Sequence, residues 1–450
     1  MNAVKPVLCR FYRSAYYPLL VVFLAFCGHV TEQDILFIGL MGASMLPALF
    51  LCDDIRFAVM PVLSFVFTVS PKDYSPNDTG YAERFLNPVV LTFLVILGSV
   101  LLFSLGYFLI VNRKKVNRQS RNSSWVSVAV LCGAMLLNGI FSRNYKINNV
   151  LYVLLVSACM VGIYFLFSFY MHFDKTSVDY LMYCFVLAGL LISAEVIAAY
   201  CTTATLGNKE SVILGWGIWT AIGGMLAFLM PACFYFAASH PHGWIWFGLG
   251  LFEFFCIFLS QSRGALLFGM VGLMLCFLYL FFRGKNRTQN RILIGFLIAA
   301  GLVGMLLLKD QILEMLKNFK TLGDNGRTEK WAGGWNNFKK YPIFGSGFYD
   351  SFRDPAFEHG FDPYLYHNTV IQMLGACGLV GFLAYVFHRV QTVRLVFKKI
   401  NPCKIFLGIA LLCFLLFNLL DVLFFKFYPS FFYVLMLLCM EKSEINHNDL

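Results

Sequence analysis

The sequence predicts an all-α, polytopic integral membrane protein with about 12–14 transmembrane helices and one large external loop. Hydrophobic residues make up 59% of the chain and charged residues only 13%, whereas a soluble protein is about 25% charged. Apolar runs of about 20 residues, the length that crosses a bilayer, recur from end to end. The net charge of +11 comes from basic residues between these runs, as in membrane topology. We therefore expect the lipid bilayer as a partner and no nucleic acid.

The candidate spans, taken in order, cover most of the chain. Each is an apolar run, and those at 56–70, 125–141 and 427–440 are short for a membrane crossing. The full set is 15–30, 35–51, 56–70, 89–111, 125–141, 147–171, 179–201, 214–238, 243–260, 264–282, 291–308, 366–388, 404–425 and 427–440. If a short run is re-entrant or interfacial, the count falls toward about 12.

The distribution of charge predicts that the N-terminus and the C-terminus are both cytoplasmic. With alternating spans, 112–124, 283–291 and 388–404 lie on the inner side, and these segments contain Lys and Arg but no Asp or Glu. The outer side receives 71–88 and 309–366, and the latter holds basic and acidic residues in equal number. An excess of Lys and Arg in the inner loops is the pattern found in multi-pass proteins.

The spans and the long loop divide the chain into four parts. We expect N-terminal transmembrane helices at 1–240 and further transmembrane helices at 241–308, around a Ser-Arg-Gly junction. A large extracytoplasmic loop follows at 309–366, and C-terminal transmembrane helices at 367–450. Within the loop, 309–320 has its apolar residues on one face, which predicts a helix lying along the membrane surface.

A polar pair, His367 and Asn368, stands before an apolar run long enough to cross a membrane. Because a helix advances about 100° per residue, the sequence predicts one stripe of His367, Gly378 and Gly381, with the histidine at the N-terminal end of the helix. Glycines let a neighbouring helix approach closely, so this packing would fix the histidine at the membrane surface. The alternative is a histidine that only marks the polar end of a span.

Two arginines fall on the same predicted side as His367. Arg263 stands in the tight segment Ser-Gln-Ser-Arg-Gly-Ala, at the start of a helix whose free N–H groups suit a phosphate. Its guanidinium adds a forked, permanent cation, and the alternative is an anchor that snorkels to the interface. Arg327 lies with Lys330 in the large loop, where the alternative is an ordinary solvated helix start. Because Arg263, Arg327 and His367 fall on the same predicted side of the membrane, we expect them to form one site.

Further candidate substrate contacts are Asn368, Lys330, Trp331 and Lys209, and Lys209 is followed by the acidic Glu210. The ring of Trp331 suits stacking on a sugar face, with anchoring at the membrane interface as the alternative.

Ionisable residues inside spans are costly and are candidates for function. They are Glu195, Glu253 and Asp421, the last with Lys426, a pair that is equally consistent with a structural ion pair. The chain has no Walker loop, Asp-x-Asp pair, His-Glu-x-x-His or suitable Gly-x-Ser-x-Gly, and no Cys-x-x-Cys pair. We therefore expect no metal and no cofactor.

The Ser-Arg-Gly-Ala junction at 262–265, Arg327 with Trp331, the Gly-containing turn at 341–348, and His-Asn at 367–368 followed by two glycines together resemble one family. They look like the O-antigen ligase/polymerase family of bacterial membrane glycosyltransferases. The resemblance covers about 250–390, and the histidine motif is similar to that of the ligase-like branch, which also includes protein O-oligosaccharyltransferases.

The resemblance implies a GT-C-like fold and an activity in cell-surface polysaccharide biosynthesis. Members move a glycan from undecaprenyl diphosphate to an acceptor hydroxyl on a glycan, lipid or protein. They act at the outer face of the bacterial plasma (inner) membrane, without metal or nucleotide. Carried over, His367 is catalytic, and Arg263 and Arg327 bind the diphosphate.

The chemistry of these residue types agrees with that assignment. Two arginines supply charge to stabilise a diphosphate leaving group, and an imidazole that titrates near neutral pH suits proton removal from a hydroxyl. Three alternatives remain open at this point: a repeat-unit polymerase or protein O-oligosaccharyltransferase, a transporter or flippase of lipid-linked sugars, and a membrane scaffold without chemistry.

Overall fold

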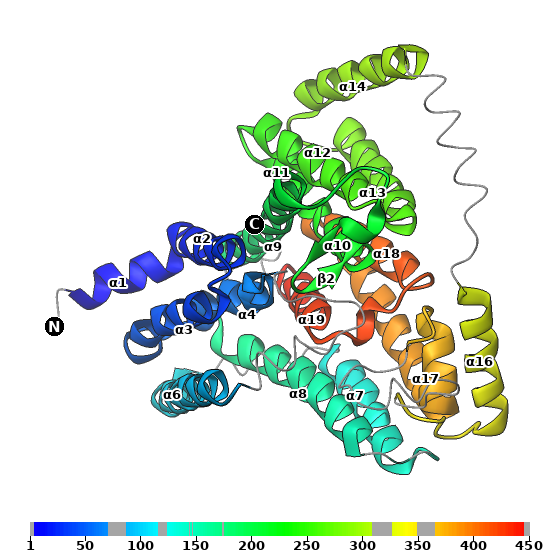
Figure 1. Cartoon of the computed structure of the whole chain (residues 1–450). Helices are drawn as coiled ribbons and strands as arrows, with labels where there is room; N and C mark the ends of the chain where they lie inside the picture. Colours follow the sequence, from blue (N-terminus) through cyan, green and yellow to red (C-terminus); the bar gives the residue numbers. More distant parts are fainter. Residues whose placement is uncertain are drawn as a thin grey trace.

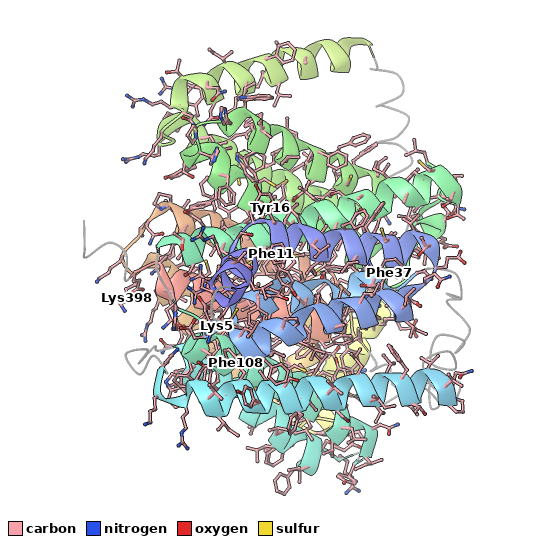
Figure 2. All side chains as sticks on the ribbon, turned by 90° about the vertical axis from the view of Figure 1, so that its left-hand side faces the viewer. Lys5, Phe11, Tyr16, Phe37, Phe108 and Lys398 are labelled. Atoms are coloured by element: carbon pink, nitrogen blue, oxygen red, sulfur yellow. The ribbon has the colours of Figure 1, made fainter. Side chains whose placement is uncertain are left out.

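The computed structural model describes residues 4–70, 87–115, 124–143, 145, 147–172, 175–307, 326–348 and 365–444. Most helices run roughly parallel, and Lys5 and Lys398 lie toward the same end of the bundle (Figure 2). The N-terminal helices are α1 (Val4–Arg13), α2 (Tyr16–Thr31), α3 (Asp34–Leu51), η1 (Ile55–Ala58), α4 (Val59–Ser64), η2 (Phe65–Thr68), α6 (Pro88–Asn112), η3 (Arg113–Lys115), α7 (Ser124–Phe141), α8 (Ile147–Tyr170) and α9 (Lys175–Thr202).

The second half of the chain continues the bundle after one small hairpin. Its elements are η4 (Lys209–Ser211), β1 (Ile213–Leu214), β2 (Gly217–Ile218), α10 (Trp219–Leu229), α11 (Pro231–Ser239), α12 (Gly243–Leu259), α13 (Arg263–Phe282), α14 (Arg287–Leu307), α16 (Arg327–Lys340), α17 (Thr369–Phe397), α18 (Pro402–Phe417), η6 (Leu423–Phe425) and α19 (Phe427–Lys442). The predicted surface helix at 309–320 lies outside the described residues.

The predicted all-α, multi-pass membrane architecture is confirmed. Among the described residues, eight helices are long and apolar enough to cross a membrane, and the bent pair α1–α2 would make a ninth. This number is below the about 12–14 predicted. Ile55–Thr68, Gly243–Leu259 and Pro402–Phe417 are apolar but have 17 residues or fewer, and α14 and α19 are not among the eight. The axes of α1 and α2 meet at 67°, so α1 does not continue the direction of α2.

Two helices illustrate how burial decides the length that a helix needs. Central α19 has only 16 residues, and every residue from Tyr428 to Lys442 is buried by neighbouring helices (Figure 1). Peripheral α6 has 25 residues and buries only Ser104, Phe108 and Asn112, as expected of a helix that faces lipid on most sides. A helix enclosed by protein does not have to match the bilayer thickness, which explains why the short run at 427–440 is a helix.

The small hairpin changes the start of one predicted span. Strands β1 and β2 pair antiparallel, with Ile213 opposite Ile218. The turn between them places the ring of Trp216 at 4.7 Å from that of Phe67 and 5.5 Å from that of Tyr428. The span predicted at 214–238 therefore begins at α10, after the hairpin, and Pro231 starts a second helix, α11, because proline cannot continue the hydrogen-bond ladder of α10.

The helix α17 is interrupted by the chain that follows α16. Gly378 has φ 64° and ψ −163°, which is not helical. At this break, the N–H of Leu379 donates to the carbonyl oxygen of Pro342 at 2.8 Å, and the N–H of Val380 donates to that of Ile343 at 3.2 Å. A Cβ on Gly378 would stand 2.4 Å from the carbonyl oxygen of Ile343. Carbonyl oxygens of the turn at 341–348 thus accept hydrogen bonds from N–H groups of α17 that would bond within the helix if it were unbroken.

The predicted stripe of His367, Gly378 and Gly381 on one helix is therefore wrong. His367 precedes α17, which begins at Thr369, and Gly378 breaks the helix. The glycine that permits close helix packing is Gly375, whose added Cβ would lie 2.8 Å from the carbonyl oxygen of Gly334 in α16. The predicted stripe requires an unbroken helix, and the backbone contacts with 341–348 accompany a break in α17 at Gly378.

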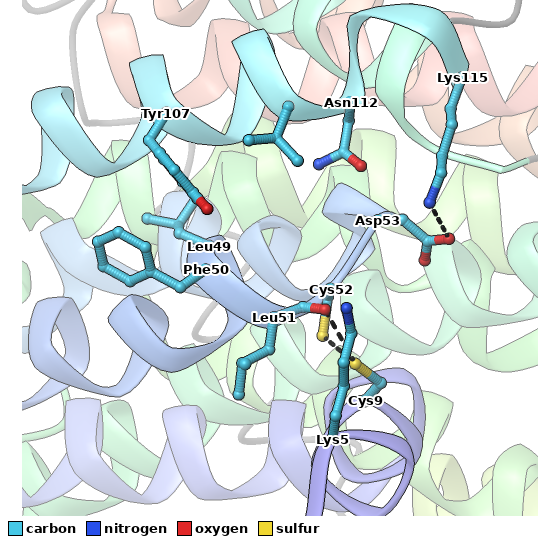
Figure 3. Close-up of a pocket in the computed structure, with 11 residues that line it drawn as sticks. Lys5, Cys9, Leu49, Phe50, Leu51, Cys52, Asp53, Tyr107, Asn112 and Lys115 are labelled. Atoms are coloured by element: carbon cyan, nitrogen blue, oxygen red, sulfur yellow. Dashed lines mark hydrogen bonds and ion pairs between the residues drawn. The ribbon is translucent and has the colours of Figure 1, made fainter. Parts of the chain in front are cut away.

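A pocket at the opposite end of the bundle is lined by α1, α3, α6 and the residues that follow α3 and α6 (Figure 3). Asp53 forms ion pairs there with Arg13 and with Lys115. None of its lining residues comes from α13, α16 or α17. This pocket is therefore separate from the predicted site.

Candidate functional site

His367 stands just before the first turn of α17, in the left-handed backbone region with φ 53°. Asn368 is the N-cap of the helix: its Oδ1 accepts from the N–H of Val370 at 2.9 Å and of Ile371 at 3.1 Å. Asparagine is a favoured N-cap because its side chain satisfies N–H groups that have no partner in the first turn. The cap starts the helix after Asn368, which leaves His367 outside the helix.

The helix α16 brings two further predicted residues to this turn. It packs beside α17 (Figure 1), where Gly334 approaches Gly375, and Asn337 Nδ2 donates to the hydroxyl of Tyr366 at 2.8 Å. Trp331, one turn earlier, donates from Nε1 to the carbonyl oxygen of His367 at 3.4 Å. The glycine contact sets the separation of the helices, and the tryptophan supports the backbone of the histidine.

Three ionisable side chains meet at the histidine. Lys330 Nζ lies 2.9 Å from His367 Nε2, and His367 Nδ1 lies 3.4 Å from Asp421 Oδ1. The His367 side chain is 32% exposed, whereas that of Asp421 is 9% exposed. We call Lys330, His367 and Asp421 the histidine cluster. It has a buried acidic end and an imidazole that remains open to solvent.

The environment shifts the titration of both neighbours of His367. Burial by itself would raise the pKa of Asp421, but the hydrogen bond and charge of His367, with the charge of Lys426 and the N–H of Val422, together lower this pKa below its usual range. Burial lowers the pKa of Lys330, Asp421 raises it, and Arg327 lowers it, with a net lowering. Asp421 is therefore ionised at neutral pH, and it pairs with His367.

The loop that carries Asp421 is fixed to the start of α17. The N–H of Thr369 donates to the carbonyl oxygen of Asn418 at 2.8 Å, and Asn368 Nδ2 donates to that of Leu419 at 3.0 Å. The side-chain oxygen of Asn418 accepts from the N–H of Phe424 at 2.8 Å. These bonds hold the carboxylate opposite the ring of His367. The sequence suggested Lys426 as the partner of Asp421. The approach of Asp421 to His367 could not be predicted, because it depends on contacts between distant segments.

Arg263 is the first residue of α13, after the N-cap Ser262. The next residue, Gly264, packs against the loop of the cluster: an added Cβ would lie 3.2 Å from Leu420 Cδ1. Leu420 directly precedes Asp421 in the chain. The arginine predicted to bind a diphosphate therefore begins its helix beside the loop that orients His367, and its side chain is partly exposed.

Gln261 is a structural member of this region that sequence reasoning missed. It has φ 56°, and its side chain accepts from the N–H of Gly207 at 3.1 Å and donates to the carbonyl oxygen of Thr205 at 2.9 Å. Gln261 thus ties the loop after α9 to the junction before Arg263. The signal available in the sequence is its place in a very short connection between two apolar runs, where a left-handed residue is often needed.

The remaining predicted contacts are distributed around the same end of the bundle. Arg327 opens α16 one turn before Lys330 and is partly exposed. Lys209 Nζ lies over the ring of Trp219 at 5.6 Å, in the loop that Gln261 holds, and Glu210 beside it is exposed. Asn368 uses its Oδ1 and one N–H in the contacts given above, so its contact with a substrate stays a prediction.

Two of the buried acidic residues have other partners. Glu195 accepts from the indole N–H of Trp216 at 2.7 Å, which joins α9 to the hairpin. Glu253 accepts from the thiol of Cys233 at 3.2 Å, and Gly189 leaves the space for its carboxyl group. These contacts hold helices together and place neither group in the histidine cluster. Within the described ranges, no group of three or more His, Cys, Asp or Glu is arranged to hold a metal ion.

One family model matches the segment of the chain that contains most of these residues. Residues 247–386 match the family model described as O-antigen ligase. The matched stretch begins in α12 and ends in α17, so it includes Arg263, Arg327 and His367 but not Asp421. No curated protein matches the chain.

Proposed function

We propose that the chain moves a glycan from undecaprenyl diphosphate to an acceptor hydroxyl at the outer face of the plasma membrane, and the match of residues 247–386 to the family model described as O-antigen ligase supports this proposal. The observation that carries the proposal is the histidine cluster: a half-open imidazole with a buried carboxylate on Nδ1 and cationic residues around it. Arg263 begins α13 beside the loop that carries Asp421, and Arg327 begins α16, the helix that bears Lys330.

In the proposed reaction, the acceptor oxygen attacks the anomeric carbon of the donor glycan. The bond from that carbon to the diphosphate oxygen breaks, and undecaprenyl diphosphate leaves with the electron pair. The acceptor hydroxyl loses its proton to His367 Nε2. One glycosidic bond forms, one bond to the diphosphate breaks, and the proton remains on the imidazole until solvent removes it.

Asp421 orients the base in this proposal. Its carboxylate faces Nδ1 at 3.4 Å, which favours the tautomer with the proton on Nδ1 and the lone pair on Nε2. The same carboxylate stabilises the imidazolium that forms when the hydroxyl loses its proton. Asp421 is thus a positioning residue that acts through His367.

Arg263 and Arg327 serve the leaving group. Negative charge increases on the diphosphate as the bond to the sugar breaks, and permanent cations placed beforehand stabilise that charge without reorganisation. Arg263 adds its guanidinium to the N-terminal end of α13, which already favours anions. We propose that the two arginines supply the charge that a metal ion supplies in other transferases, and therefore that a chelator leaves transfer unchanged.

The test is glycan transfer in cells that lack their own ligase or polymerase, with His367→Gln at the same membrane abundance as the wild type. General base catalysis contributes about 10²- to 10⁴-fold, so we expect a loss of that size, with accumulation of the lipid-linked glycan. His240→Gln is the matched control, because His240 is exposed in the connection between α11 and α12. Transfer at the wild-type rate by His367→Gln would exclude this base.

The products of the same experiment separate the two forms of the proposal. Single additions to lipid, glycan or protein indicate a ligase, whereas ladders that grow by repeat units indicate a polymerase. Extraction of the membranes before and after adding acceptor shows which molecule receives the glycan. The proposal requires that at least one of these products carries the donor glycan in a covalent bond.

A further inference from the structure

The contact between Lys330 and His367 occupies the nitrogen that the reaction needs. Lys330 Nζ lies 2.9 Å from His367 Nε2, a hydrogen-bond distance. In the proposed function, this nitrogen takes the proton of the acceptor hydroxyl. A lone pair that already accepts a hydrogen bond from an ammonium group does not accept a proton from a hydroxyl at the same time.

The protonation of the pair follows from its neighbours. Nδ1 of His367 faces the carboxylate of Asp421 at 3.4 Å, so the ring proton belongs on Nδ1. A second ring proton on Nε2 would point at the ammonium group of Lys330, and two donors facing each other at 2.9 Å repel. The consistent arrangement is a neutral imidazole whose Nε2 accepts a hydrogen bond from Lys330.

Helix packing sets the position of Lys330, whereas nearby charges stabilise its positive charge only modestly. Lys330 is on α16, which Gly334 holds against α17, and Trp331 beside it donates to the backbone of His367. Asp421 attracts the ammonium group through space, and Arg327, one turn earlier, repels it. A neutral nitrogen is a weaker partner for the ammonium group than a diphosphate oxygen, because the charged oxygen adds Coulombic attraction between opposite charges.

We propose that Lys330 caps the base in the donor-free enzyme, and that the diphosphate of the donor draws Lys330 away and exposes His367 Nε2. The inference rests on the proposed function and adds an order of binding to it: donor first, acceptor second. The enzyme then activates a hydroxyl only when a diphosphate is present to leave. The hydrogen-bond partner of Lys330 changes from the imidazole of His367 to the diphosphate of the donor during each cycle.

The experiment measures the accessibility of His367 Nε2 directly and does not depend on transfer. Diethyl pyrocarbonate acylates unprotonated ring nitrogens of histidine, and peptide mass spectrometry follows the modification of each histidine in the full-length protein in nanodiscs. The proteins are the wild type, Lys330→Met, and Lys339→Met as the matched control, because Lys339 is exposed on the same helix. Exposed His240 serves as the internal reference for rate and for folding.

We expect Lys330→Met to raise the rate at His367 about tenfold, the effect of removing one hydrogen bond to a charged group. Undecaprenyl diphosphate should raise the wild-type rate toward that of Lys330→Met and leave the variant unchanged. Lys330→Arg keeps the charge and the N–H donors, so it should retain the donor-dependent rise. Lys339→Met should match the wild type under each condition.

Equal rates at His367 in the wild type and in Lys330→Met would overturn the cap, as would a wild-type rate that undecaprenyl diphosphate does not raise. An equal effect of inorganic pyrophosphate at the same concentration would overturn the assignment to the lipid-linked donor. Failure of the proposed function looks different: the wild type would transfer no glycan in cells, whatever the reactivity of His367. The two ideas are therefore tested separately.

Discussion

Two clusters of charged side chains, at different places in the fold, show how similar residues serve different purposes. The arginine cluster consists of Asp54, Arg56, Ser177 and the backbone carbonyl of His172. Arg56 Nε lies 2.7 Å from Asp54 Oδ2, and its Nη2 donates to Ser177 Oγ at 2.9 Å and to the carbonyl oxygen of His172 at 3.1 Å. The side chains of Asp54 and Arg56 are 0% and 7% exposed.

The histidine cluster has the same kinds of charge but leaves its central group open. The side chain of His367 is 32% exposed, and its Nε2 lies 2.9 Å from Lys330 Nζ, which we propose moves to the diphosphate of the donor. In the arginine cluster, the carboxylate and the guanidinium are surrounded by protein groups that satisfy them. The comparison teaches that a buried charge with complete hydrogen bonding holds helices in place, whereas a charge pair with one open side is available for chemistry.

The largest expected effect is a loss of stability when the arginine cluster is disrupted. Arg56→Met leaves Asp54 buried without its cation, and breaking a buried pair costs about 3–5 kcal/mol. We expect that loss in the free energy of unfolding, with unchanged transfer per folded molecule, measured by denaturant titration and by transfer at equal folded abundance. The control is Arg13→Met: the side chains of Arg13 and Asp53 are 40% and 37% exposed, and exposed pairs contribute about 0–1 kcal/mol. Equal costs for the two variants would contradict the structural role of Arg56.

A smaller effect tests the carboxylate of the histidine cluster. Asp421→Asn keeps the shape of the side chain and removes its charge, and loss of one hydrogen bond to a charged group costs about 1.5–3 kcal/mol, or about 10- to 100-fold in rate. We expect this loss in kcat, with little change in KM for the acceptor. A loss of stability with an unchanged kcat per folded molecule would assign Asp421 to the scaffold instead.

The smallest expected effect distinguishes two arginines at opposite ends of one helix. Arg263 and Arg283 stand at the two ends of α13, about 30 Å apart along a helix of 20 residues. Arg263→Gln should raise KM for the lipid-linked donor about tenfold, the effect of one lost hydrogen bond to a charged group. Arg283→Gln should leave it unchanged. The measurement is transfer as a function of donor concentration, and equal effects of the two substitutions would remove Arg263 from the diphosphate site.

Much of the architecture is predictable from the sequence because the hydrophobic pattern is local. Each predicted apolar run corresponds to a helix or to a short series of helical turns, and the resemblance at about 250–390 agrees with the family match at 247–386. The local patterns fail where a distant segment intervenes. The backbone of 341–348 breaks α17 at Gly378, and the cap by Asn368 removes His367 from the helix.

The sequence alone proposes the candidate site as a set of residue types but not as a set of partners. Arg263, Arg327 and His367 are predicted from motifs that lie on one predicted side of the membrane, and their roles stay predictions. The pairing of His367 with Asp421 joins residues 54 positions apart, and it depends on hydrogen bonds from Thr369 and Asn368 to the loop after α18. Gln261 is similar, because its role consists of bonds to a loop more than 50 residues earlier.

The sequence by itself therefore determined the class of protein, the positions of its helices and the chemical groups available to a transferase. These features depend on apolar runs, on charge between them and on the identities of single residues, all of which are local. The tertiary structure alone decided which carboxylate faces His367, that Lys330 occupies Nε2, and that Gly378 bends a helix around a neighbouring turn. Those results depend on distances of a few ångströms between remote segments, because hydrogen bonds and ion pairs form only where packing brings their atoms together.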